Sequence, residues 1–147
     1  MNEELEDRIY EVAISANFVP QFYKDYVLFQ AHSPCGEDIF FEVYKDDYTF
    51  DDIFDEVMAN FKYFDVDEHA VMWYETHGKS GAPKDLRTLL NDAQAIKNMY
   101  GYLYIQMYSL KEKLEEELEE EWLQKNSMKE AKRESDVNWK SWLLLEF

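Results

Sequence analysis

The stretch DIFFEVYKDDYTFDDIFDEVM, residues 38–58, contains a change in hydrophobic period that decides the fold class. Over residues 38–44 apolar and polar positions alternate, which is typical of a strand with one buried face. The apolar side of this strand is expected to carry Ile39, Phe41 and Val43. From Thr49, which with Asp52 resembles a capping box, the apolar spacing becomes helical. The expected buried stripe of this helix is Phe50, Ile53, Phe54, Val57, Met58 and Phe61.

The sequence upstream predicts two further strands. Residues 9–18 place apolar side chains on one face and polar ones on the other, which favours a strand that Pro20 ends. Residues 26–31 (YVLFQA) are apolar enough for a second strand, and the turn residues 33–36 follow it closely. We therefore expect an antiparallel hairpin between residues 26–31 and 38–44.

The sequence downstream predicts two more helices. Asp67 can cap the first, which is expected to run to about Thr76. The glycines and the proline of residues 78–83 indicate a tight loop, and a long helix begins near Lys84. Its apolar positions are spaced as in a coiled-coil seam: Ala93, Ile96, Tyr100, Leu103, Met107, Leu110 and Leu114, extended by Leu118 and Trp122. Gly101 within the helix leaves a kink or a break open as an alternative.

These elements together predict one α+β domain, residues 1–147. A three-stranded antiparallel sheet at the N-terminus is packed by three helices, of which the last is long and coiled-coil-like. The strands are expected within residues 9–44 and the helices within residues 49–126. Residues 127–147 are expected to form a loose segment and an apolar C-terminal tail, WLLLEF, that docks on the core or on a partner.

The charge of the chain restricts the class of partner. Asp and Glu number 32 against 15 Lys and Arg, a formal net charge of −17, yet 46% of the residues are hydrophobic, which excludes a disordered acidic chain. Such a charge repels nucleic acid and anionic membranes and attracts basic proteins. The N-terminus lacks a secretory signal pattern, and no apolar stretch approaches the ~20 residues of a membrane helix. We therefore expect a cytoplasmic protein that binds neither nucleic acid directly nor a membrane.

Residue types that support catalysis or metal binding are present without the spacing that such sites require. His69 and His77 are eight residues apart, whereas a helical zinc site needs two histidines four apart. Cys35, the only cysteine, is flanked by acids, which disfavour a thiolate, and residues 78–83 lack the spacing of a phosphate-binding loop. The acids of this stretch are Asp65, Asp67 and Glu68, and the stretch is interpreted as a capping aspartate with surface histidines. We expect no enzymatic activity, cofactor or metal, although convergence of the histidines in the fold is left open.

Acidic residues gather in the middle of the chain. Between Glu37 and Glu68 there are twelve acids and two lysines, a net charge of −10 in 32 residues. The helix that begins at Thr49 carries Asp51, Asp52, Asp55 and Glu56. These four charges span about 7.5 Å, or one per ~1.9 Å, whereas duplex DNA carries one per ~1.7 Å of its axis. A second run, EEELEEE, follows at residues 115–121. The alternative interpretation of both runs is a pair of solvated faces.

Residues 64–99 resemble a segment of small acidic proteins that phages and mobile elements of Firmicutes encode. The shared pattern is F-D-x-D-E-H-A-x-M-W, a Gly/Pro loop, and L-x-x-L-x-x-D-A-x-x-I. It falls here on Phe64, Asp65, Asp67, Glu68, His69, Ala70, Met72 and Trp73, on Gly81 and Pro83, and on Leu86, Leu89, Asp92, Ala93 and Ile96. The resemblance covers about a quarter of the chain and implies a mobile-element origin. Proteins of that origin often act against host defences, and some of them resemble DNA to their targets.

Charge and resemblance together predict an anti-defence inhibitor of the anti-CRISPR type. It is expected to act as a DNA mimic that occupies a basic nucleic-acid-binding surface, such as that of a CRISPR effector. The expected partner-binding residues are Asp46, Asp47, Asp51, Asp52, Asp55 and Glu56, the exposed aromatic anchors Tyr44 and Tyr48, and secondly Glu115, Glu116, Glu117, Glu119, Glu120 and Glu121. The alternative is an interaction module that forms a homodimer, or docks on one partner, through the heptad helix and the apolar tail.

Overall fold

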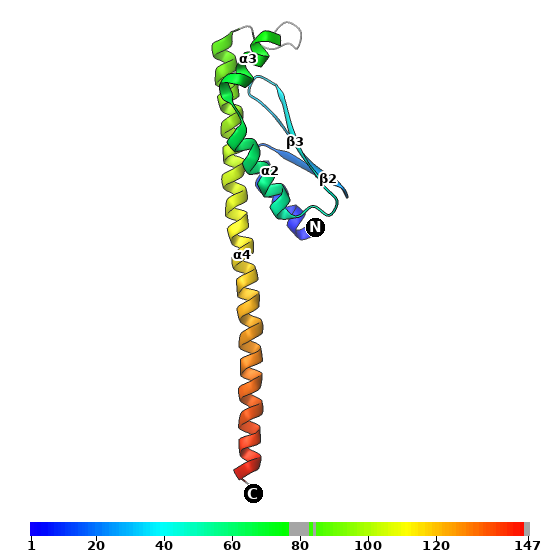
Figure 1. Ribbon diagram of the computed structural model, residues 1–147, viewed down its shortest axis with the longest axis vertical. Helices are drawn as coiled ribbons and strands as arrows, with labels where there is room; N and C mark the ends of the chain where they lie inside the picture. The colour runs from blue at the N-terminus through cyan, green and yellow to red at the C-terminus, as the bar shows by residue number, and fades with distance from the viewer. Residues whose placement is uncertain (77–82, 84, 146–147) are drawn as a thin grey trace. The chain divides into compact units, whose positions relative to one another are not determined.

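The computed structural model describes residues 1–76, 83 and 85–145, with side chains described as far as residue 129. The fold is α+β, with a three-stranded antiparallel sheet near the N-terminus and a long final helix (Figure 1). The elements are α1 (Glu3–Ser15), β1 (Val19–Phe22), β2 (Tyr26–His32), β3 (Asp38–Tyr44), α2 (Phe50–Tyr63), α3 (Val66–Thr76) and α4 (Leu86–Leu145). Internal contacts divide the chain into two compact units, Met1–Leu110 and Lys111–Phe147.

The sheet has the strand order β1-β2-β3, and both pairs are antiparallel. The predicted hairpin is confirmed: β3 has the expected bounds, and β2 extends to His32. Because side chains alternate along a strand, one face of this hairpin is buried throughout. That inner face consists of Val27, Phe29, Ala31, Ile39, Phe41 and Val43.

The N-terminal segment is a helix, so the strand predicted over residues 9–18 is wrong. The side chain of Asn2 caps α1 by accepting the N–H of Leu5 at 2.8 Å, and three glutamates in the first turn suit the positive end of the helix dipole. Ile9 and Ala13, four residues apart, are buried, which is the helical period. Tyr10 and Ile14, which are exposed, and Val12, which is half-buried, produced the apparent alternation.

The end of α1 leads directly into the edge strand β1. Asn17 adopts a left-handed conformation, with φ of 66°, just after the helix. The N–H groups of Asn17 and Phe18 donate to the carbonyls of Ile14 and Ala13, which is the Schellman arrangement. Pro20 was expected to end a strand but lies inside β1, where an edge strand tolerates its missing N–H.

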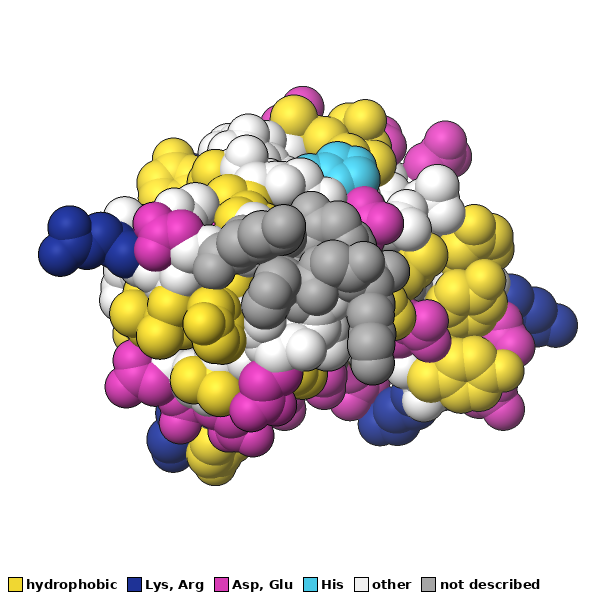
Figure 2. Space-filling model, turned by 90° about the horizontal axis from the view of Figure 1, so that it is seen from above, with side chains coloured by type: hydrophobic (Ala, Val, Ile, Leu, Met, Phe, Trp, Pro, Cys, Tyr) yellow, Lys and Arg dark blue, Asp and Glu magenta, His cyan; other side chains and the backbone are white. Residues whose placement is uncertain are grey.

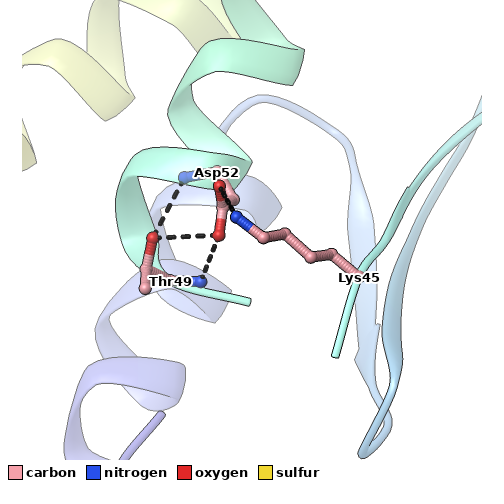
Figure 3. Close-up of polar contacts among 3 residues, drawn as sticks. All are labelled: Lys45, Thr49 and Asp52. Atoms are coloured by element: carbon pink, nitrogen blue, oxygen red, sulfur yellow. Dashed lines mark hydrogen bonds and ion pairs between the residues drawn. The ribbon is translucent and has the colours of Figure 1, made fainter. Parts of the chain in front are cut away.

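Helix α2 begins as its sequence predicts. Thr49 Oγ1 accepts the N–H of Asp52, and the Asp52 carboxylate accepts the N–H of Thr49 at 2.9 Å, which forms the capping box (Figure 3). The four expected core residues of its first two turns are buried: Phe50, Ile53, Phe54 and Val57. Met58, also expected in the stripe, is exposed, and Phe61 is half-buried.

The next two helices also begin at carboxylate caps. Asp65 accepts the N–H of Glu68, so the cap of α3 is Asp65 and not the predicted Asp67. Asp85 accepts the N–H of Arg87 at the start of α4. Lys84, where the long helix was expected to begin, lies outside the described residues. Ala70 of α3 packs with two residues of α4, Leu89 and Ala93, in a small apolar cluster.

Within the first unit, α4 packs against both the sheet and α2. The ring centroid of Tyr100 lies 5.6 Å from that of Phe18 and 6.1 Å from that of Phe41, and Tyr104 stacks on Phe61 at 5.8 Å. The predicted seam is buried from its first residue to Leu110. The seam therefore belongs to the core of the protein as far as this residue.

Helix α4 is continuous through Gly101, without the break left open by the sequence. A Cβ at this position would lie 2.9 Å from Cε1 of Phe61. The glycine therefore lets α2 approach α4 closely, which explains why a poor helix former stands in the middle of a long helix.

The second unit contains the C-terminal part of α4. The helix extends to Leu145, where a loose segment was expected from residue 127. Leu118 and Trp122 are 66% and 63% exposed, so these extensions of the seam are not buried. The side chains of the apolar tail lie beyond the last described one, and its docking stays a prediction.

Candidate functional site

The acidic residues of the predicted site lie in the loop after β3 and on the outer side of α2. Asp46, Asp47, Asp51 and Asp55 are exposed, whereas Asp52 and Glu56 are half-buried. The structure therefore brings the first six predicted carboxylates into one region. It also divides them into residues with hydrogen-bond or ion-pair partners within the fold and residues for which the described part of the chain supplies none.

Asp52 is part of the fold. Besides closing the capping box, its carboxylate pairs with Lys45 Nζ at 3.1 Å (Figure 3). The backbone hydrogen bond from Thr49, and then the contact with Lys45, hold the pKa of Asp52 below its ordinary value. Its charge is already compensated, so it is a weaker phosphate analogue than its neighbours.

Glu56 is also engaged locally. Asn60 Nδ2 donates to the main-chain oxygen of Glu56 at 2.8 Å and to its carboxylate at 3.2 Å. By contrast, the structure gives no hydrogen-bond or ion-pair partner among the described residues to Asp46, Asp51 or Asp55. These three carboxylates are the ones that a basic partner can reach without disturbing the fold.

One of the two predicted aromatic anchors is buried. Tyr44 is 72% exposed, as expected, but Tyr48 is only 5% exposed, and its hydroxyl donates to the main-chain oxygen of Tyr23 at 2.8 Å. Asp47 directly before it has a positive φ of 53°, so the strand alternation does not continue into Tyr48. Burial, followed by the charge of Glu6, raises the pKa of the Tyr48 hydroxyl. Tyr48 is therefore not available as an anchor.

The second predicted run lies in the other compact unit. Glu115, Glu116, Glu117, Glu119, Glu120 and Glu121 are all exposed. Leu118 and Trp122 stand among them and are also exposed. This part of α4 therefore presents a mixed acidic and apolar surface.

Beside the predicted Tyr44, the outer face of the sheet carries three aromatic residues that sequence reasoning missed: Tyr23, Tyr26 and Phe40. Tyr23 stacks on Tyr26 at 4.5 Å between ring centroids, Tyr26 stacks on Tyr44 at 5.6 Å, and Phe40 on β3 is 62% exposed. The same alternation that places Phe41 in the core places its neighbours on the opposite face, so the signal was present. Figure 2 shows exposed hydrophobic side chains lying among acidic ones at the end of the protein that it presents.

The suspected metal-site residues serve the packing of α3. Asp65 caps the helix, and His69 Nε2 lies 2.8 Å from the Glu37 carboxylate, in a contact where both side chains are largely buried. His77 lies outside the described residues, as do most of residues 78–83. In the part of the chain that the structure describes, no three His, Cys, Asp or Glu side chains are arranged to hold a metal ion.

Cys35 lies at the tip of the β2–β3 hairpin. Its backbone N–H donates to Asp92 Oδ1 at 2.9 Å, which ties this turn to α4. Desolvation, followed by the Asp92 charge, raises the pKa of the thiol, so the protonated form dominates at neutral pH.

Burial, with a contribution from Glu37, raises the pKa of Tyr100 to about 12.

No described helix has a segment long and apolar enough to cross a membrane. Comparison of the chain with known proteins matches no protein-family model, no curated protein and no solved structure.

Proposed function

We propose that the protein is an inhibitor that binds a basic nucleic-acid-binding surface of a defence protein, such as a CRISPR effector, by presenting carboxylates in place of phosphates. The observation that carries the proposal is a group of three exposed carboxylates, Asp46, Asp51 and Asp55. Among the described residues, the structure gives them no hydrogen-bond or ion-pair partner. Arginines that bind phosphates also form strong charge-assisted hydrogen bonds with carboxylates. The net charge of −17 steers the protein toward such a surface and makes association sensitive to salt.

The structure refines which residues carry the mimicry. Reversal of all six predicted acids would damage the α2 cap through Asp52 and would confuse binding with stability. A variant with Asp46, Asp51 and Asp55 changed to Lys alters only exposed carboxylates. A matched variant with Asp7, Glu11 and Glu75 changed to Lys alters the same number of exposed charges on α1 and α3.

The test is inhibition of duplex DNA binding by a purified RNA-guided CRISPR effector, measured by mobility shift over a range of salt concentrations. Wild type is expected to compete with the duplex and to weaken as salt rises. The Asp46, Asp51 and Asp55 variant should lose roughly tenfold or more in apparent affinity, because each substituted charge becomes repulsive. The matched variant should lose much less. Equal losses of affinity in both variants would mean that net charge alone, and not these three carboxylates, determines the inhibition. Inhibition that does not change with salt concentration would contradict mimicry.

The exposed apolar residues of the second unit favour a second candidate, a dimerisation or docking module. The seam from Ala93 to Leu110 is buried within the first unit, so among the seam positions only those beyond Leu110 can contact another chain. Leu118 and Trp122 are exposed and provide such positions. Sedimentation of wild type and of a variant with both residues changed to Ser separates the two candidates, because only a dimer that uses them would dissociate.

A further inference from the structure

The outer face of the sheet presents a row of aromatic rings, of which Tyr23 and Tyr44 are exposed and Tyr26 is half-buried. The row runs from Tyr23, just after β1, to Tyr26 on β2 and Tyr44 on β3, with centroid separations of 4.5 and 5.6 Å. It ends on the edge strand β3, where Tyr44 is 72% exposed. The inner face already supplies the core, so burial within the fold does not require these rings.

Two acids, Asp25 and Glu42, lie beside this row, and Lys24 follows Tyr23 in the sequence. Asp25 directly precedes Tyr26, and desolvation, followed by Tyr23, Asp25 and Glu42, raises the pKa of the Tyr26 hydroxyl. Glu42 precedes Tyr44 by two residues and therefore stands on the same face. Lys45, the cation next to Tyr44 in sequence, is directed to Asp52 at 3.1 Å. The exposed ring of Tyr44 thus stands in a surface of negative charge.

We propose that this outer sheet face, composed of Tyr23, Tyr26, Phe40, Glu42 and Tyr44, binds an arginine-bearing basic segment of a partner protein. The planar guanidinium stacks on the open side of Tyr44 and donates hydrogen bonds to a neighbouring carboxylate. Lysine has no planar group and satisfies only the charge. Nucleic acid and a second copy of this chain both bring negative charge to the face and are disfavoured.

The inference deepens the proposed function and rests on it in one respect, because both assign a basic protein partner. It adds the chemistry of recognition, arginine in preference to lysine, and the aromatic face of β3, which adjoins Asp46 and does not include Asp51 and Asp55 of α2. The proposed function and this inference can fail independently. Salt-sensitive competition with DNA tests the carboxylates, whereas discrimination between the two cations tests the aromatic face.

The experiment compares fluorescein-labelled nona-arginine and nona-lysine peptides by anisotropy with the full chain at physiological salt. General acidity, including that of residues 115–121, attracts both peptides, so the ratio of their affinities is the readout. Tyr44→Ser is the test variant. Tyr63→Ser is the matched control, since Tyr63 on α2 is 74% exposed, close to the 72% of Tyr44. Amide shifts of ¹⁵N-labelled protein locate the bound peptide.

Wild type is expected to bind nona-arginine more tightly than nona-lysine, by about two- to fivefold for each stacked ring. Tyr44→Ser should reduce that preference, Tyr63→Ser should keep it, and the amide shifts should concentrate on β3 and the start of β2. Equal affinity for the two peptides, absence of binding, or an equal effect of both serine variants would each overturn the proposal. Shifts confined to α4 would do the same.

Discussion

Replacing Asp52 with alanine tests the division of the acidic residues into structural and exposed groups. The change removes the acceptor for the Thr49 N–H at 2.9 Å and the partner of Lys45 Nζ at 3.1 Å. Loss of a capping side chain costs about 1 kcal/mol, and loss of a solvent-accessible ion pair adds about 0.3 kcal/mol. Asp55→Ala removes the same formal charge one turn later, from an exposed position, and should change the free energy of unfolding by less than about 0.5 kcal/mol.

Urea unfolding followed by far-ultraviolet circular dichroism at pH 7 measures both variants. The pKa of Asp52 is lowered in the folded protein, so its contribution is complete above the unfolded value of about 3.9 and is lost as the pH falls through the folded value. The deficit of Asp52→Ala relative to wild type should therefore shrink at pH values below about 3 to 4. Equal stability of the two alanine variants at pH 7, or a deficit that does not change with pH, would refute the assignment of Asp52 to the fold.

Two other changes test the packing of α4. Gly101→Ala should destabilise the protein in the same unfolding assay, because a Cβ 2.9 Å from Phe61 costs about 1–3 kcal/mol and the gain in helix propensity is about 1 kcal/mol. Adding Phe61→Leu should reduce the loss of stability. A Gly101→Ala variant more stable than wild type would contradict the close approach of α2 and α4. Leu103→Ala should lower the free energy of unfolding by about 2–5 kcal/mol, because Leu103 is fully buried. Leu118→Ala should change it by less than about 0.5 kcal/mol, because Leu118 is 66% exposed. Similar changes for both variants would contradict a seam that ends inside the first unit.

The sequence predicted the elements in which a single period dominates. The β3 strand and the α2 helix have unambiguous patterns, and the capping box marks their junction to the residue. The segment that forms α1 contains both periods, since Tyr10, Val12 and Ile14 alternate while Ile9 and Ala13 repeat every four residues. Alternation predicts the wrong element here because the local pattern does not contain which apolar residues the rest of the fold covers. The polar signals at its N-terminus, Asn2 followed by three glutamates, were the better guide.

The candidate site was predictable in location and not in detail. Exposure of Asp51 and Asp55 follows from the helical period of α2. The burial of Tyr48 depends on the positive φ of Asp47, which changes the direction of the chain after β3 and is not encoded in any period. The pairing of Asp52 with Lys45 joins a loop to a helix, and a contact of this kind becomes evident only in three dimensions.

The helix caps have a consequence for how this sequence can vary. In the described part of the chain, each of the four helices begins at a side chain that accepts a backbone N–H, namely Asn2, Thr49, Asp65 and Asp85. Such positions tolerate only a few residue types, since the oxygen must stand at one place relative to the chain. An exposed carboxylate that serves as a charge for a partner is bound by no such condition. Related sequences under selection for charge would therefore keep the residue types at the capping positions. Their other acids would change position on the surface, and only the number of these acids would be preserved.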